Sequence, residues 1–155
     1  MVEALGGAAT PVDWGELYTA IQKGVVDGAE NNPPSFYLSR HYELSKYFSL
    51  DEHTAVPDVL IMSLHVWQDL TPEQQQWVQQ AANDSIVYQR AAWQQASDQA
   101  LAAVKAAGVT VIYPDKRPFR EAVAPFYQQM LQTPIGPLLQ QIAQKSDVKT
   151  EVVDD

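Results

Sequence analysis

The sequence predicts an α/β fold that is rich in helix, with a small mixed sheet and one long helix. Three observations predict it. The chain has 155 residues, 46% of them hydrophobic, which is enough for one sizeable core but short for two independent domains. Most apolar residues recur at helical spacing, and short β-favouring runs are few. Residues 73–107 contain neither proline nor glycine, so one helix can run through them.

Composition and charge exclude several classes of protein. The chain has no cysteine, which excludes a disulfide framework, a zinc finger and a thiol nucleophile. A net charge of -9 argues against nucleic acid as a partner, because that surface needs clustered Lys and Arg. No apolar run approaches the ~20 residues of a membrane span. Residues 1–10 lack the features of a secretory signal, so we expect a cytoplasmic chain or one whose natural beginning is missing.

The first third of the chain predicts two helices and a strand. Asp13 can cap a helix over 13–24, and Gly24 supplies its stop. Asn31 and Asn32 precede two prolines, which suits the start of a second helix over 34–48. The apolar residues between 50 and 64 are mostly β-favouring and predict a buried strand.

The remainder predicts the long helix, a short strand and two further helices. Thr71 to Gln74 form a capping box, and the helix that follows continues to Ala107, before Gly108. At 1.5 Å per residue this helix is about 50 Å long, whereas a compact domain of this size has a diameter of roughly 35–40 Å. The helix must therefore kink, pair with another helix or pack against a second body. We expect a strand over 109–113, a helix over 118–131 kinked or split by Pro125, a helix over 134–145, and a frayed tail over 146–155.

Two groups of residues can support chemistry. The densest cluster of titratable side chains consists of Asp51, Glu52 and His53. It could form a metal site or an acid/base site, or it could lie on a solvated loop before a strand. The sequence favours the solvated loop. Asn31 and Asn32 lie at a helix N-terminus, where free N–H groups favour an anion or a hydroxyl-rich ligand. The alternative is that these asparagines cap the helix while the aromatic residues that follow belong to the core.

A longer pattern resembles a known family. Residues 14–33 read WGELYTAIQKGVVDGAENNP and resemble the solute-binding proteins of tripartite ATP-independent periplasmic (TRAP) transporters, with their E-x-Y, A-x-Q-x-G-x-V-D-G-x-E-N spacing. The likeness covers essentially the whole chain. It implies the C-terminal portion of a two-lobe periplasmic solute-binding fold, with residues 1–155 as a single partial domain whose N-terminal lobe is absent. The long helix spans both lobes in that family.

The resemblance also implies ligand-binding residues. The aromatic residue two before the motif's Glu lines the cleft, here Trp14, and the motif's Asn contacts polar groups of the ligand, here Asn31. Asn32 begins a stretch similar to the subgroup that binds sugar acids such as uronates. His53 and Asp58 lie on the segment that passes near the cleft. The arginine that binds the ligand carboxylate belongs to a K-x-R-V segment, and none of the four arginines here matches it.

We therefore expect a binding protein that captures an organic acid, a sugar acid such as a uronate, for delivery to the membrane permease subunits of a TRAP transporter. No catalytic residue, metal or cofactor is expected, and binding is expected to be impaired in this chain. Exposed apolar surface left by the missing lobe predicts self-association. Two alternatives are a helical protein–protein interaction module that uses the 71–107 helix, and a hydrolase or metal enzyme that uses Asp51, Glu52 and His53.

Overall fold

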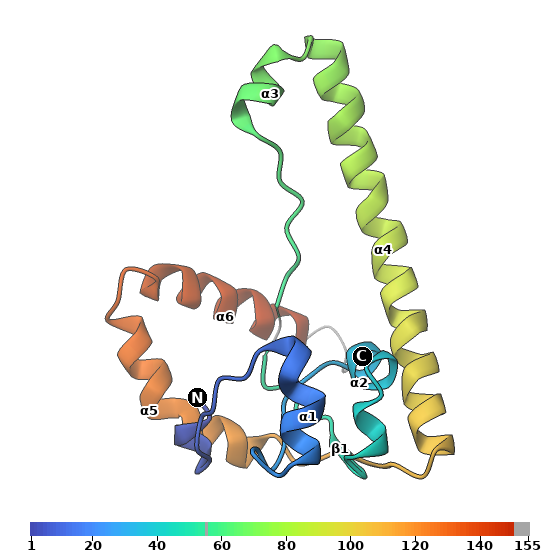
Figure 1. Ribbon diagram of the computed structural model, residues 1–155. Helices are drawn as coiled ribbons and strands as arrows, with labels where there is room; N and C mark the ends of the chain where they lie inside the picture. The colour runs from blue at the N-terminus through green and yellow to red at the C-terminus, as the bar shows by residue number, and fades with distance from the viewer. Residues whose placement is uncertain (55, 151–155) are drawn as a thin grey trace. The chain divides into compact units, whose positions relative to one another are not determined.

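The computed structural model describes residues 1–54 and 56–150, with the backbone alone for 146–150. The chain divides into two compact units, one of Val12–Tyr113 and one of Met1–Pro11 together with the residues from Pro114 onward. The prediction of a single partial domain over 1–155 stays a prediction. Figure 1 labels most of the helices and strands. The larger unit contains the 3-10 turn Trp14–Glu16, α1 (Leu17–Gln22), α2 (Pro33–Leu38), the 3-10 turn His41–Glu43, β1 (Tyr47–Ser49), α3 (Leu64–Asp69), α4 (Pro72–Ala106) and β2 (Thr110–Ile112).

The first predicted helix is present in a shorter form. A 3-10 turn leads into α1, and Gly24 ends the helical region with a φ of 68°. Asp13 occupies the N-cap position of the turn, but its side chain makes no capping hydrogen bond. Its carbonyl oxygen accepts a hydrogen bond from the Glu16 N–H at 2.9 Å instead.

The second predicted helix, over 34–48, is wrong in its second half. It begins as expected, because the Asn32 side chain accepts a hydrogen bond from the Ser35 N–H at 2.9 Å and prolines occupy the first positions. It ends at Leu38, since Arg40 takes a left-handed conformation with a φ of 60°. The residues 47–49 then form β1, where the aromatic side chains suit a strand better than a helix.

The small sheet consists of β1 and β2, which pair in parallel with Tyr47 opposite Thr110 and Ser49 opposite Ile112. A parallel pair needs a long connection, and here it contains both α3 and α4. The core gathers beneath this pair. Phe36, Val104 and Val109 are buried together, with Tyr42, Phe48 and Val111 packed against them. The Phe36 and Phe48 rings stack with centroids 4.6 Å apart.

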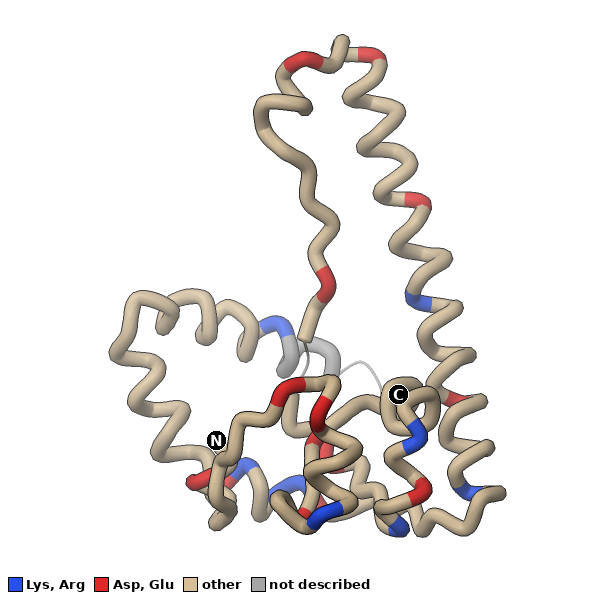
Figure 2. Tube along the Cα trace, in the orientation of Figure 1, with Lys and Arg blue, Asp and Glu red and all other residues tan. Residues whose placement is uncertain are grey.

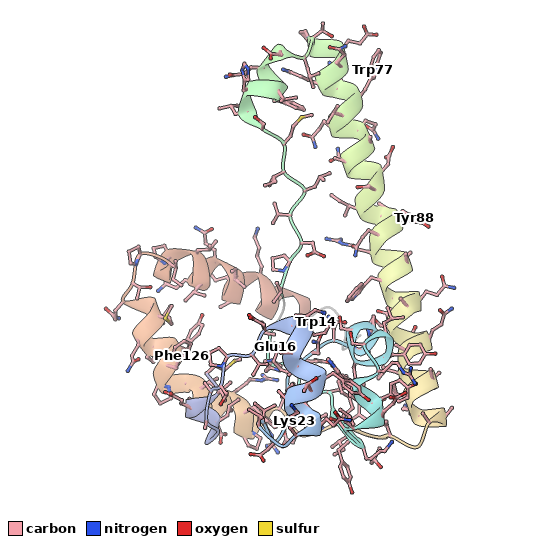
Figure 3. The ribbon with its side chains drawn as sticks, viewed as in Figure 1. Trp14, Glu16, Lys23, Trp77, Tyr88 and Phe126 are labelled. Carbon is pink, nitrogen blue, oxygen red and sulfur yellow. The ribbon has the colours of Figure 1, made fainter. Side chains whose placement is uncertain are left out.

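The long helix is confirmed as α4, a single run of 35 residues. Its capping box is complete: the Thr71 N–H donates to Gln74 Oε1 at 2.9 Å, and the Gln74 N–H donates to Thr71 Oγ1 at 3.3 Å. The last part of α4 packs on α2 and β2. Between residues 76 and 95 every residue but Ala82 is exposed, including the Trp77 and Tyr88 labelled in Figure 3. Figure 2 shows few charges along this stretch.

The predicted buried strand between residues 50 and 64 is wrong. Within the described part of this segment, which omits residue 55, no strand is present. The apolar run Val59 to Met62 is exposed instead, and Ile61 is 84% exposed. A strand needs hydrogen-bonding partners as well as apolar side chains, and the described residues supply no neighbouring strand to this run.

The smaller unit holds a 3-10 turn (Glu3–Leu5), α5 (Arg117–Leu131) and α6 (Gly136–Thr150). The expected interruption at Pro125 does not split α5, which is one helix of 15 residues. The last helix begins at Gly136 and continues past the predicted end at residue 145 to Thr150. Residues 151–155, the remainder of the predicted tail, lie outside the described residues. The Tyr127 hydroxyl donates to the Leu139 carbonyl at 3.4 Å and joins the two helices.

Among the described helices, none combines the length and the hydrophobicity that crossing a bilayer requires.

Candidate functional site

A hollow of about 710 Å³ lies within the larger unit. The turn after α1, the start of α2, the residues around β1 and the loop that follows β1 form its walls. This volume falls in the range of sites that bind small molecules. Its lining is chemically mixed. Its charged and polar side chains include Asp27, Glu30, Asn31, His41, Lys46, Asp51 and His53.

His53 stands between two carboxylates at the edge of this hollow. Its Nδ1 lies 2.8 Å from Asp51 Oδ1, and its Nε2 lies 3.7 Å from Glu30 Oε2. The side chains of His53 and Asp51 are 19% and 25% exposed, whereas that of Glu30 is 70% exposed. An ionised carboxylate only accepts hydrogen bonds, so Nδ1 carries the proton and donates to Asp51. In the neutral ring, Nε2 is therefore an acceptor.

The two neighbouring asparagines have different contacts. Asn31 lines the hollow, and its Oδ1 accepts a hydrogen bond from the Asn32 N–H at 2.9 Å. This bond uses one lone pair of Oδ1, so Asn31 can still offer a ligand its amide nitrogen as a donor and the second lone pair of Oδ1 as an acceptor. Asn32 caps α2 through its own Oδ1 and is not among the lining residues.

The indole of Trp14 is not part of the lining, but it touches a residue that is. Its ring meets the His41 ring edge to face, with centroids 5.4 Å apart, and the Tyr18 ring lies 6.2 Å from His41 on a tilted plane. His41 is buried, and burial lowers the pKa of its imidazole below the ordinary 6.5 because the charged form loses hydration. We expect a neutral ring at pH 7.

The structure thus brings Asn31 and His53 into one hollow and leaves the other predicted contacts outside its lining. Trp14 contacts the ring of His41, which is a lining residue, but does not line the hollow itself. Asn32 caps α2, and Asp58 lies on the exposed segment after residue 55. A role for any of the five in ligand binding stays a prediction.

The sequence groups Asp51 with His53, two residues apart, in a cluster that it favours as a solvated loop. Sequence reasoning missed the other neighbour of His53, Glu30. Glu30 comes from a separate segment, so its approach to His53 depends on the fold. Within the described residues, no group of three or more His, Asp or Glu is placed to hold a metal ion. The metal-enzyme alternative therefore lacks a set of ligands in this part of the chain.

Comparison with known proteins decides the family. The sequence profile of the bacterial extracellular solute-binding proteins, family 7, matches residues 1–133. The chain belongs to this family. A solute-binding protein of Chromohalobacter salexigens is 38% identical over 133 residues, which are 85% of this chain and 40% of that protein.

Solved structures support the same assignment. A TRAP periplasmic solute-binding protein of Xanthobacter autotrophicus with bound β-D-galacturonate is 43% identical, with a TM-score of 0.77, over 85% of this chain and 44% of its own. One from Pseudomonas putida with bound D-glucuronate is 36% identical, with a TM-score of 0.81, over 94% of this chain and 46% of its own. The resemblance to TRAP solute-binding proteins is thereby confirmed.

The family 7 chain spans less than half the length of each of these relatives. Its fold is a portion of their two-lobe fold, rich in helix and with a small sheet, as predicted. These relatives are solute-binding proteins rather than enzymes, and the two solved structures are periplasmic proteins.

Proposed function

We propose that this chain forms part of a periplasmic solute-binding protein that captures a sugar acid of the uronate class for a TRAP transporter. The observation that carries the proposal is the 43% identity to a structure that holds β-D-galacturonate, over 85% of this chain. The hollow around Asn31 and His53 supports it, because it has the size of a small-molecule site and polar groups suited to a sugar.

The proposed ligand contacts follow from the position of each residue. The amide nitrogen of Asn31 donates to a polar group of the ligand, and His53 contacts the ligand from the loop after β1. Trp14 packs on the carbon skeleton of the ligand, next to His41, while Asn32 and Asp58 lie further out. Capture and delivery need no catalytic group. Closure of two lobes buries the ligand, and the closed form docks on the membrane permease subunits.

Affinity is expected to be low in this chain alone. The lining of the hollow contains Lys46 but, among the described residues, no arginine, so the ligand carboxylate lacks there the arginine partner that the family resemblance implies. Loss of one partner of a buried charge pair costs about 2–5 kcal/mol, which is roughly a 30- to 4,000-fold weakening. We expect dissociation constants well above the micromolar range for both galacturonate and glucuronate.

Isothermal titration calorimetry and amide-detected NMR test this proposal. We expect saturable, millimolar responses to D-galacturonate or D-glucuronate, and weaker ones after Asn31→Ala. Asn83→Ala is the matched control, since that residue is exposed on α4 and lies outside the lining. The proposal fails if neither uronate gives a saturable response. Micromolar binding by the 155-residue chain would show that no second lobe is needed.

We further propose that the exposed apolar surface is covered by another body in the intact family fold and causes self-association without it. This surface consists of Val59 to Met62 and the exposed side chains of α4, such as Trp77 and Trp93. Surfaces of this kind mark interaction sites. A helical interaction module would offer the same face of α4, but the family assignment favours coverage by a second lobe.

Sedimentation velocity tests the self-association. We expect oligomers at high protein concentration, and fewer of them after Ile61→Asp. Leu138→Asp changes an exposed leucine of the smaller unit and serves as the control. A clean monomer at high concentration would contradict the proposal.

A further inference from the structure

The loop between α1 and α2 contains the one aspartate–glycine pair of the sequence, Asp27–Gly28. Both residues are exposed, and both line the hollow. Because glycine has no side chain, the backbone nitrogen of Gly28 can approach the carboxyl carbon of Asp27 with little steric hindrance. The pair therefore places an electrophilic carbon beside a backbone nitrogen on an accessible surface.

The backbone around this pair has few restraints. Among the described residues, no N–H group from Val26 to Asn31 donates a hydrogen bond to a main-chain carbonyl. Within the same part of the chain, the Gly28 N–H has no side-chain acceptor, and the Asp27 carboxylate has no hydrogen bond or ion pair. Segments with so few contacts open locally at a low free-energy cost. The nitrogen and the carboxyl carbon can therefore rotate toward each other without unfolding the chain.

We propose that Asp27 is a site of spontaneous isoaspartate formation, a covalent modification that moves its peptide bond to Gly28 onto the side-chain carbon. The Gly28 nitrogen attacks Asp27 Cγ and forms a C–N bond, while a Cγ–O bond of the protonated carboxyl group breaks. The departing hydroxyl takes the proton of the nitrogen and leaves as water, which closes a cyclic imide.

Water then opens this imide in one of two ways. If the bond between the nitrogen and Cγ breaks, aspartate is restored. If the bond between the nitrogen and the main-chain carbonyl carbon breaks, the product is isoaspartate at residue 27. One water is lost and one is gained, so the reaction needs no oxidant, ligand or cofactor and does not rest on the proposed function.

The fold protects a second pair with similar chemistry, Asp84–Ser85. Asp84 is also exposed and also precedes a small residue. Both residues lie inside α4, where the Ser85 N–H is part of the helical hydrogen-bond ladder and Asp84 Oδ1 accepts from Gln80 Nε2 at 2.8 Å. Helical dihedral angles keep that nitrogen turned away from the carboxyl carbon. The two pairs therefore differ in backbone freedom while both are accessible to water.

The modification changes the wall of the hollow. Isoaspartate adds one methylene carbon to the main chain and removes it from the side chain, three residues before Glu30 and four before Asn31, which both line the hollow. We expect the amide NMR signals of Glu30 and Asn31 to shift in the modified chain. The signal of Gln94, which is exposed on α4 and outside the lining, should not shift.

The experiment incubates the full 155-residue chain in mildly acidic buffer at physiological temperature, folded in one sample and denatured with guanidinium chloride in the other. Peptide mapping with electron-transfer fragmentation distinguishes isoaspartate from aspartate at each position. We expect isoaspartate at residue 27 to accumulate at rates within about threefold in the two samples. At residue 84 we expect it in the denatured chain and at least about tenfold more slowly in the folded one.

Two variants test the chemistry. Gly28→Ala should slow the reaction at residue 27 about tenfold, because a Cβ hinders the approach of the nitrogen. The fold should tolerate it, since a Cβ at this position meets no atom within 4 Å and the φ of Gly28 is not positive. Asp27→Glu should abolish the product at residue 27, because the longer side chain closes a larger and slower-forming ring. Circular dichroism checks that both variants fold.

Each contrary outcome overturns a stated part of the proposal. Absence of isoaspartate at residue 27 in the folded chain, or its formation there more than about tenfold slower than in the denatured chain, overturns the site. Equal rates at residue 84 in the two samples overturn backbone freedom as the cause. Unshifted signals of Glu30 and Asn31 in the modified chain overturn the effect on the hollow. The comparison of folded with denatured chain uses the unmodified sequence, so it does not depend on how any variant folds.

Discussion

Val104→Ala tests the packing that supports one wall of the hollow. Val104 is 1% exposed on the last turns of α4 and packs in one cluster with Phe36 and Val109. Phe36 also lines the hollow. The substitution removes two methyl-sized groups, each worth about 0.8 kcal/mol of buried apolar transfer. The void that they leave adds a further cost, so we expect a loss of about 2–3 kcal/mol in the free energy of unfolding.

Urea unfolding followed by circular dichroism measures this loss, from the shift of the midpoint at an unchanged slope. Val87→Ala provides the matched control, because it is the same substitution on the same helix at a residue that is 74% exposed. It should change the free energy of unfolding by no more than about 0.5 kcal/mol. The account of the core is refuted if Val104→Ala is as mild as the control, or if the control is as costly as Val104→Ala.

Three further predictions concern helix caps and pH. Asn32→Ala should lower the free energy of unfolding by about 1 kcal/mol in urea, because the Ser35 N–H loses its acceptor, whereas Asn32→Asp should keep most of it; equal stability of the two variants would contradict the cap. Thr71→Ala should cost about 1 kcal/mol and speed amide exchange in the first turn of α4, and unchanged exchange would speak against the capping box. Burial lowers the pKa of His41 below 6.5, so the unfolded chain binds a proton more readily than the folded one. The neutral His41 ring therefore makes its full contribution to the free energy of unfolding above pH 6.5. This contribution is lost as the pH falls from 6.5 toward the folded-state pKa, by at most about 1.4 kcal/mol per pH unit. His41→Gln should flatten the dependence of the urea midpoint between pH 7.5 and 5.5, and an equally steep dependence in that variant would argue against His41 as its source.

Features of the fold set by local sequence could be predicted. The start of α4 follows from Thr71 and Gln74, which lie within one helical turn, and the start of α2 follows from Asn32 and its prolines. Features set by distant partners could not. Residues 47–49 form a strand because residues 110–112 pair with them. No sequence feature near residue 47 indicates this pairing. The run Val59 to Met62 has strand-like side chains but no strand beside it in the described residues.

The candidate site likewise has some features that could be predicted from the sequence and others that depend on distant partners. Asn31 and His53 were predicted from the resemblance to a family, and both line the hollow. The approach of Glu30 to His53 joins two segments more than twenty residues apart, which no local pattern encodes. The contact of Trp14 with His41 likewise depends on how α1 packs against the turn at 41–43.

The pairing of β1 with β2 has a consequence for synthesis on the ribosome. Tyr47 meets Thr110, which follows it by 63 residues, so this wall of the hollow cannot close until most of the chain has been translated. The intervening α4 depends on local hydrogen bonds and can form earlier. A nascent chain that stops short of Thr110 would therefore carry the long helix already formed, but β1 would have no partner strand and this wall of the hollow would lack its support.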